Sequence, residues 1–282
     1  MAKISELILL AKKKWGEQAD SLAIEVWLAD CIGKSKEYIF MEKEAEVPGQ
    51  IAEKFWIGID SMIDGMPLAQ LLGKKEFYGM DFIINQHVLI PRPESELLVD
   101  LARKYISENM GKSKYAVLDV GTGSGAILLA LAAVENRVVG LGLEISEEAL
   151  AVAEQNVLQL GLGERVVLKQ SDLLQKMGDF IPEIILANLP YIGTERFNFV
   201  ARDVEKYEPS VALFGGLDGL DLYRKLFDQI NNLPTKPKIV IGEFGFGQAE
   251  SMAELLSEKF SSIFSWEIVD DLAGIPRVFV LS

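Results

Sequence analysis

Cysteine and histidine are almost absent from this chain. Its 282 residues contain one of each, Cys31 and His87. A single cysteine excludes an internal disulfide framework and a thiolate metal cluster, and a single histidine excludes a histidine-rich metal site. We therefore expect no bound metal. We interpret His87 as an exposed residue of a linker rather than as an acid or base.

Long apolar runs and clustered positive charge are also missing. No stretch reaches the ~18 apolar residues that a membrane span requires, and Lys3 and Glu6 lie in an amphipathic pattern rather than in a signal peptide. The net charge is −14, which repels nucleic acid phosphates. The one basic run, residues 12–14, suits the solvated face of a helix. We expect a cytoplasmic monomer that binds neither membranes nor nucleic acid.

Residues 1–75 have the apolar spacing of helices. Apolar side chains recur every three or four positions from Ile4 to Trp15 and again from Ala23 to Ile32. Pro48 and Gly49 interrupt the pattern, which then resumes. We find no convincing strand pair here. The segment is predicted to be a small helical domain, either a packing module or a docking domain for a macromolecular partner.

Residues 76–92 have a different character. β-branched and aromatic residues flank Asn85-Gln86, which predicts a β-hairpin that turns at this pair. Prolines on both sides of Arg92 stiffen the chain after it, and a helix is expected to begin near Ser95. We interpret residues 76–92 as a hairpin linker between two domains.

Residues 93–282 alternate between strand and helix patterns, which indicates a parallel sheet. We predict an α/β fold with a doubly wound, mostly parallel, seven-stranded sheet. The last two strands are separated only by residues 272–275, so they should pair as a hairpin and add one antiparallel strand. The predicted strands are residues 116–120, 138–144, 166–170, 183–187, 238–244, 265–270 and 276–281.

A glycine-rich loop, Gly121-Thr122-Gly123-Ser124-Gly125, follows the first of these strands and leads into an apolar helix. Glycines let the backbone turn tightly and approach a ligand at a helix N-terminus. Glu144 ends the second strand, where a carboxylate can accept both hydrogen bonds from a ribose diol. Ile145 beside it is included in the predicted site. The pattern predicts a nucleotide-like cofactor and fits a dinucleotide as well.

Asp119, at the end of the first strand, favours a cationic cofactor. A dinucleotide's pyrophosphate needs no anion nearby, whereas S-adenosyl-L-methionine carries a sulfonium and an ammonium group. Asp172 and Leu173 follow the third strand. Asp172 can accept from an adenine amine, with a helix N-cap as the alternative, and Leu173 can pack on the ring. These residues together predict a methyltransferase that uses S-adenosyl-L-methionine.

The fourth strand ends at Asn188-Leu189-Pro190-Tyr191. Proline cannot continue a ladder, and ligands of doubly wound sheets bind at the carboxyl ends of strands. In motifs of the Asn-Pro-Pro-Tyr type, the Asn oxygen and the next carbonyl accept both N–H bonds of a planar amino group, and the aromatic ring stacks on it. This geometry aims the nitrogen lone pair at the methyl carbon without a strong general base.

The chain resembles the release-factor glutamine methyltransferases, the HemK/PrmC family, over nearly its whole length. The resemblance implies a helical N-terminal domain, a hairpin and a class I methyltransferase domain. It also implies the substrate, the glutamine of the Gly-Gly-Gln loop of class-1 peptide chain release factors. The stretches that carry it, besides the Gly121 loop and the Asn188 motif, are Leu71-Leu72-Gly73, Glu76-Phe77-Tyr78, Leu89 to Glu96, Asp203-Val204, Tyr207-Glu208-Pro209, Ala212 to Gly216, Asp218 to Asp221 and Glu243-Phe244-Gly245.

Two positions depart from this family. Leu189 stands where proline is usual, which keeps the carbonyl but loses the rigidity of a fixed φ, and Glu144 stands where aspartate is common. Asn-Leu-Pro-Tyr is also typical of rRNA adenine dimethyltransferases, so an adenine amino-group methyltransferase acting on RNA or DNA is the alternative. A dinucleotide-dependent dehydrogenase and a catalytically silent binding module are weaker alternatives, because Asp119 opposes the first and the intact Asn188 motif opposes the second.

Overall fold

The computed structural model describes residues 2–194 and 206–282, and these residues form two compact units. The first unit runs to Lys74 and also contains Lys206 and Tyr207. The second contains the remaining described residues from Lys75 onward, including the predicted linker. No helix in the described part of the chain is both long and apolar enough to cross a membrane.

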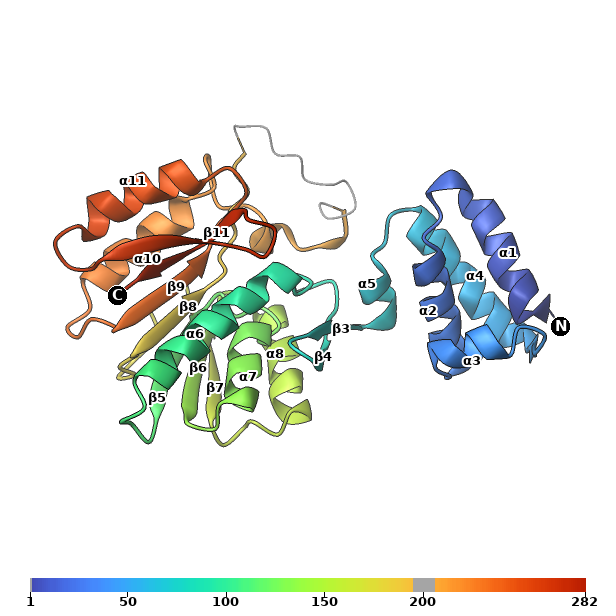
Figure 1. Ribbon diagram of the computed structural model, residues 1–282, viewed down its shortest axis with the longest axis horizontal. Helices are drawn as coiled ribbons and strands as arrows, with labels where there is room; N and C mark the ends of the chain where they lie inside the picture. The colour runs from blue at the N-terminus through green and yellow to red at the C-terminus, as the bar shows by residue number, and fades with distance from the viewer. Residues whose placement is uncertain (1, 195–205) are drawn as a thin grey trace. The chain divides into compact units, whose positions relative to one another are not determined.

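The first unit is mostly helical (Figure 1). Its buried side chains form one core around Ile24, Trp27 and Phe55. The expectation of no strand pair was wrong, because β1 (Ala2–Lys3) pairs antiparallel with β2 (Glu46–Val47). Strands of two residues are too short for alternation to reveal them. The helices are α1 (Ile4–Trp15), α2 (Ser21–Ile32), α3 (Lys36–Met41), α4 (Gly49–Ile63) and α5 (Leu68–Leu72).

A β-hairpin follows α5, but its predicted turn was wrong. Strands β3 (Lys74–Phe77) and β4 (Met80–Ile83) form a two-stranded sheet. The turn is Tyr78-Gly79 rather than Asn85-Gln86. Tyr78 and Gly79 have φ of 53° and 75°, and type I′ hairpin turns require positive φ at both central residues.

The second unit is built on seven strands in the order β10-β11-β9-β8-β5-β6-β7. β11 is antiparallel to both of its neighbours, β9 and β10, whereas β5, β6, β7, β8 and β9 are parallel. The α/β fold with one antiparallel strand is therefore confirmed. The strands are β5 (Tyr115–Val120), β6 (Val138–Glu144), β7 (Val166–Gln170), β8 (Ile184–Ala187), β9 (Ile239–Glu243), β10 (Trp266–Asp270) and β11 (Pro276–Leu281).

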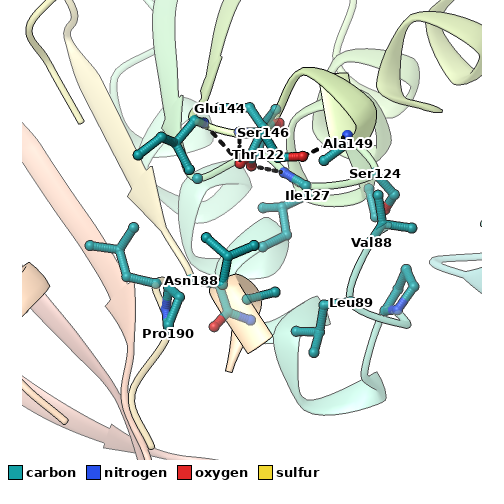
Figure 2. Close-up of a pocket in the computed structure, with 18 of the residues that line it drawn as sticks. Val88, Leu89, Thr122, Ser124, Ile127, Glu144, Ser146, Ala149, Asn188 and Pro190 are labelled. Atoms are coloured by element: carbon teal, nitrogen blue, oxygen red, sulfur yellow. Dashed lines mark hydrogen bonds between the residues drawn. The ribbon is translucent and has the colours of Figure 1, made fainter. Parts of the chain in front are cut away.

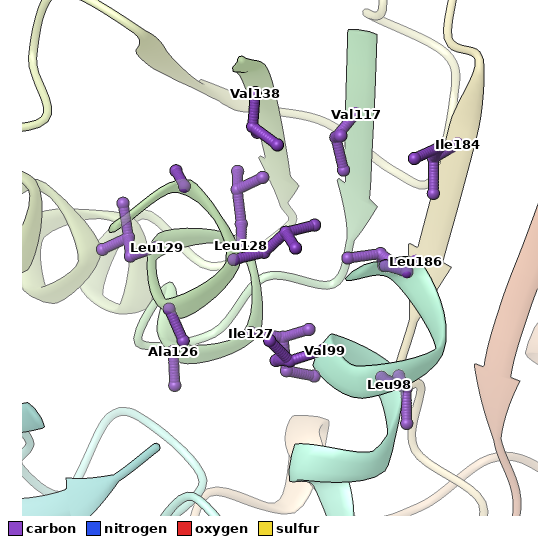
Figure 3. Close-up of a cluster of buried hydrophobic side chains, with 14 of the residues drawn as sticks. Leu98, Val99, Val117, Ala126, Ile127, Leu128, Leu129, Val138, Ile184 and Leu186 are labelled. Carbon is purple, nitrogen blue, oxygen red and sulfur yellow. The ribbon is translucent and has the colours of Figure 1, made fainter. Parts of the chain in front are cut away.

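Helices cover both faces of this sheet (Figure 1). Successive strand residues point to opposite faces, so Val117 belongs to one buried cluster and Leu118 to the other. The first cluster packs under α6 and α7, as Figure 3 shows. The helices are α6 (Glu96–Glu108), α7 (Ala126–Val134) and α8 (Glu147–Gln159) on one face, and α10 (Asp221–Asn231) and α11 (Ala249–Phe260) on the other.

The register of the parallel strands brings the functional segments together. Val120 of β5 pairs with Leu143 of β6 and with Ala187 of β8. The residues that follow these positions, Glu144 and Asn188 among them, therefore lie at one edge of the sheet together with the glycine loop. This is the edge at which doubly wound sheets bind ligands.

The core of the first unit depends on a close contact between α2 and α4. A Cβ atom at Gly58 would lie 2.2 Å from Trp27 Nε1, which donates to Phe55 O at 3.0 Å. We expect Gly58→Ala to lower the free energy of unfolding of this unit by about 1–3 kcal/mol, as overpacking does. Urea denaturation followed by tryptophan fluorescence measures it.

The matched control lies in the same helix. A Cβ atom at Gly49 would meet no atom within 4 Å, so Gly49→Ala should leave stability unchanged or raise it by up to about 1 kcal/mol. Equal unfolding free energies for the two variants would contradict the contact between Trp27 and Gly58.

Candidate active site

A cavity of about 270 Å³ lies at the carboxyl edge of the sheet. Figure 2 shows Asn188 and Pro190 on one side of it and Glu144 on the other. Three predicted site residues, Asp119, Gly125 and Tyr191, are not part of its lining. The predicted residues that line it are Gly121, Thr122, Gly123, Ser124, Glu144, Ile145, Asp172, Leu173, Asn188, Leu189 and Pro190.

The glycine loop has a backbone that only glycine adopts without strain. Gly121, Gly123 and Gly125 have φ of 71°, 56° and 83°, in the left-handed region. A Cβ at Gly123 would meet no atom within 4 Å, so at this position the conformation, rather than the space, requires glycine. The loop thus presents bare backbone to the cavity at the start of α7.

Asp119 lies beneath this loop and is 1% exposed. Its Oδ2 accepts from Thr122 Oγ1 at 2.6 Å, while its buried Oδ1 has no hydrogen-bond partner among the described residues. Burial raises the pKa of Asp119 to about 7; the Thr122 bond opposes this shift and the Glu144 carboxylate adds to it. A cation close to Oδ1 would favour the ionised carboxylate.

Glu144 is held by backbone amides. Its Oε2 accepts from Gly123 N at 2.9 Å, and its Oε1 accepts from Ile145 N at 2.8 Å and Ser146 N at 3.0 Å. A carboxylate offers about four acceptor positions, so one remains for a ligand. Accepting from both hydroxyls of a ribose would require one of these three bonds to be given up.

The chain after β7 forms a turn rather than a helix, so the N-cap alternative for Asp172 was wrong. Asp172 is exposed, and its Oδ2 accepts from Gln175 Nε2 at 3.0 Å. Leu173 is buried with φ of 49°. Ser171 Oγ donates to Leu173 O at 2.8 Å, which fixes this unusual backbone. Both predicted residues therefore reach the cavity from a braced turn.

The Asn188 side chain is oriented by two residues that sequence reasoning missed. Asn188 Nδ2 donates to Ser95 Oγ at 2.9 Å and to Glu243 Oε2 at 3.0 Å. The amide hydrogens are thereby committed, and Asn188 Oδ1 is left as an acceptor. Glu243 ends β9 at the same sheet edge, so its strand-end position was a usable signal. No sequence pattern indicates that Ser95 lies next to Asn188 and Glu243, which are far from it along the chain.

Leu189 is held in place by packing, where a proline was expected to supply rigidity. Its side chain is 3% exposed, and a Cβ on Gly121 would lie 2.9 Å from Leu189 Cδ2. Leu189 N lies 3.4 Å from Tyr223 Oη, a contact that a proline nitrogen would lack. Packing against the glycine loop and α10 thus replaces the rigidity of a fixed φ.

Tyr191 supports the motif from outside the cavity lining. Its hydroxyl donates to Glu243 Oε1 at 3.3 Å, and burial, followed by the Glu243 charge, raises its pKa. Its carbonyl is approached by the glycine-rich stretch that precedes α10, since a Cβ on Gly219 would lie 2.0 Å from Tyr191 O. A Cβ on Gly215 would likewise lie 2.2 Å from Pro190 O. The glycines allow this backbone-on-backbone support.

The segment after the hairpin forms another wall. Buried Glu208 accepts from Ile90 N at 3.1 Å and pairs with Arg92, which lines the cavity.

The expectation that His87 is exposed was wrong, because it is half-buried and lines the cavity. Asp203-Val204 lies outside the described residues. Among those described, no cluster of three His, Cys, Asp or Glu side chains is arranged to hold a metal.

Comparison with known proteins identifies the family. Residues 9–73 match the PrmC N-terminal domain, and residues 111–182 match a methyltransferase domain. The chain is 33% identical over 262 residues to the release factor glutamine methyltransferase of Bacillus cereus, covering 92% of this chain and 91% of that protein. It is 32% identical over 283 residues to the one of Clostridium acetobutylicum, covering 98% and 97%. The chain belongs to the release factor glutamine methyltransferase family.

Solved structures agree on the fold. The human METTL16 catalytic domain in complex with a MAT2A hairpin aligns with a TM-score of 0.60 at 14% identity, covering 94% of this chain and 93% of that one. The N-terminal domain of human METTL16 in complex with SAH aligns with a TM-score of 0.56 at 15% identity, covering 90% and 93%. At these identities the likeness establishes the class I methyltransferase fold alone.

The cavity of this family member fits S-adenosyl-L-methionine. The unpartnered Asp119 Oδ1 suits the ligand's positive charge, and the remaining acceptor position of Glu144 suits a ribose hydroxyl. The glycine loop offers backbone without side chains, at a helix N-terminus. This set of donors and acceptors is complementary to a zwitterionic nucleoside.

We expect cofactor affinity to depend on pH through Asp119. Its pKa is raised to about 7, and a bound cation stabilises its ionised form, so affinity should rise as pH increases through 7. For one titrating group the gain between about pH 6 and pH 8 is roughly tenfold. Calorimetric titration with S-adenosylhomocysteine, which keeps the ammonium group, measures it.

Asp119→Asn should bind more weakly at pH 8 and should lose this pH dependence. A pH-independent dissociation constant for the unmodified protein would contradict a role of Asp119 near the ligand's charge. If the pH dependence of the dissociation constant persists in Asp119→Asn, a different titrating group causes it.

Proposed function

We propose that this protein transfers a methyl group from S-adenosyl-L-methionine to the side-chain amide nitrogen of the glutamine in the Gly-Gly-Gln motif of class-1 peptide chain release factors. The observation that carries the proposal is the fixed amide of Asn188, whose Nδ2 is committed to Ser95 and Glu243. Its Oδ1 is left to accept from a substrate N–H beside the glycine loop. The family membership supports the choice of glutamine.

We propose that different cofactor residues contact different parts of S-adenosyl-L-methionine. The backbone of Gly121 to Gly125 adjoins the amino acid portion, with Asp119 near its positive charge. Glu144 accepts from the ribose, with Ile145 beside it, while Asp172 accepts from the adenine amine and Leu173 packs on the ring. When bound, S-adenosyl-L-methionine supplies a methyl group made electrophilic by its sulfonium.

The proposed catalytic residues orient the glutamine amide. Asn188 Oδ1 and the Leu189 carbonyl accept its two N–H bonds, and Pro190 and Tyr191 shape the wall. An amide nitrogen is a weak nucleophile because its lone pair is delocalised into the carbonyl. Two acceptors on the N–H bonds favour the positive charge that develops on nitrogen. Positioning then accounts for most of the acceleration, and the proton leaves after methyl transfer.

The two units have separate proposed roles. We propose residues 1–75 as a docking domain for the release factor and residues 76–92 as its linker to the methyltransferase domain. We also propose a monomer as the active species. A release factor acts on cytoplasmic ribosomes, so we expect the enzyme to work in the cytoplasm.

Asn188→Ala should abolish most turnover without affecting the cofactor. Loss of one preorganised hydrogen-bonding group costs about 10²–10³ in kcat, while the dissociation constant of S-adenosylhomocysteine should stay within about twofold. Steady-state kinetics on a release factor and calorimetry measure the two quantities. Near-normal kcat in this variant would remove Asn188 from its proposed role.

Leu189→Ala should behave in the opposite way. The variant keeps the backbone carbonyl, so kcat should stay within about tenfold, but it removes a buried side chain under Gly121. We expect the free energy of unfolding to fall by about 2–5 kcal/mol, measured by denaturation. A stable but inactive variant would show that the leucine side chain, rather than its carbonyl, serves catalysis.

The second candidate function is adenine amino-group methylation of RNA or DNA, which Asn-Leu-Pro-Tyr at residues 188–191 favours. The net charge of −14 opposes it. Incubation with methyl-labelled S-adenosyl-L-methionine and either a release factor or rRNA decides between them. We expect label in the release factor, on the Gly-Gly-Gln peptide by mass spectrometry. Label in RNA alone would overturn the proposal.

A further inference from the structure

Glu243 is a buried carboxylate in contact with the catalytic motif. It is 1% exposed and ends β9, which is parallel to β8 and pairs with it. Its Oε2 accepts from Asn188 Nδ2 at 3.0 Å and from Ser95 Oγ at 2.6 Å, and its Oε1 accepts from Tyr191 Oη at 3.3 Å. In each of these bonds the carboxylate is the acceptor.

The directions of these bonds determine which way the Asn188 amide points. A serine hydroxyl has one hydrogen, and that of Ser95 is directed to Glu243. Ser95 Oγ can therefore only accept from Asn188, as the 2.9 Å contact with Nδ2 requires. Ser95 Oγ and Glu243 Oε2 are therefore both acceptors toward Asn188, and only the NH2 group of the amide can bond to them. Rotated by 180°, Asn188 would place its oxygen against two acceptors, so this orientation is excluded.

We propose that Glu243, acting with Ser95, is a positioning residue that holds Asn188 with Oδ1 available to the substrate amide. The inference rests on the proposed function, since it concerns how the glutamine amide is received. When it is ionised, the carboxylate also places a negative charge next to Asn188, 3.0 Å from its Nδ2. Fixed charges and dipoles of this kind lower the barrier because they need no reorganisation during the reaction.

Glu243→Gln tests this with an almost isosteric change. The change removes the charge and replaces one acceptor oxygen by an NH2 group. When this NH2 faces Ser95, the serine hydroxyl is free to donate to Asn188 Oδ1, and the Asn188 amide then turns its own NH2 toward the cavity. We expect kcat on a release factor to fall by at least about tenfold. The KM of the release factor and the dissociation constant of S-adenosylhomocysteine should change by less than about threefold.

Glu183→Gln is the matched control. Glu183 precedes the opposite end of β8 and bonds Tyr105 Oη at 3.1 Å and Lys112 Nζ at 2.8 Å. The same substitution there changes a charge in the same domain without touching Asn188, so kcat should be unchanged. A comparable loss in both variants would overturn the proposal, because it would assign the effect to charge alone.

A double-mutant cycle separates positioning from a general structural effect. If Glu243 acts through Asn188, then Glu243→Gln should cause no further loss of kcat in an Asn188→Ala background. Losses that multiply in the double variant would overturn the inference, as would full kcat in Glu243→Gln. Ser95→Ala, which removes one of the two acceptors, should lose less and show the same non-additivity.

The outcomes also separate this inference from the proposed function. If Glu243→Gln fails to bind S-adenosylhomocysteine, the Ser95→Ala cycle decides: non-additive losses support the inference and multiplicative losses overturn it. If the unmodified enzyme methylates no release factor, the proposed function fails. If it does methylate one and Glu243→Gln keeps full kcat, only the role of Glu243 fails.

Discussion

The hydrogen bonds that fix the Asn188 amide are the constraint on which the site depends. Three segments far apart in the sequence supply them: the turn before α6, the end of β8 and the end of β9. The sheet brings the two strand ends together because β8 and β9 are parallel neighbours. An asparagine on a strand end has no preferred amide orientation of its own, so the buried pair Ser95 and Glu243 gives it one.

The cofactor half and the substrate half of the cavity are joined through Leu189. Its side chain packs beneath Gly121, and its nitrogen contacts Tyr223 of α10. A shift of the glycine loop would therefore move the backbone of Leu189, including its carbonyl. In this chain, the packing of the leucine side chain restrains residue 189, and a leucine at this position offers the same backbone carbonyl as a proline would.

The sequence predicted the sheet well because strand patterning is local. Each end of the seven strands lies within about one residue of its predicted position, and the terminal hairpin follows from a short connection. Local signals failed at Tyr78-Gly79, since tyrosine seldom adopts positive φ. They also missed Ser95 and Glu243 as a pair, because only the fold brings them together. Asp119 was predicted as a site residue from its place at a strand end, but its burial beneath the loop depends on packing.

Asn188 Oδ1 and the Leu189 carbonyl, the two groups that we propose receive the substrate side chain, are both hydrogen-bond acceptors. Under this proposal the site selects a primary amide, which has two N–H donors, over a carboxylate, which has none. The most direct measurement is mass spectrometry of two release-factor variants, with Gly-Gly-Gln and Gly-Gly-Glu loops, after incubation with enzyme and S-adenosyl-L-methionine. We predict one added methyl group on the glutamine loop and none on the glutamate loop. A methyl ester on the glutamate loop would contradict it.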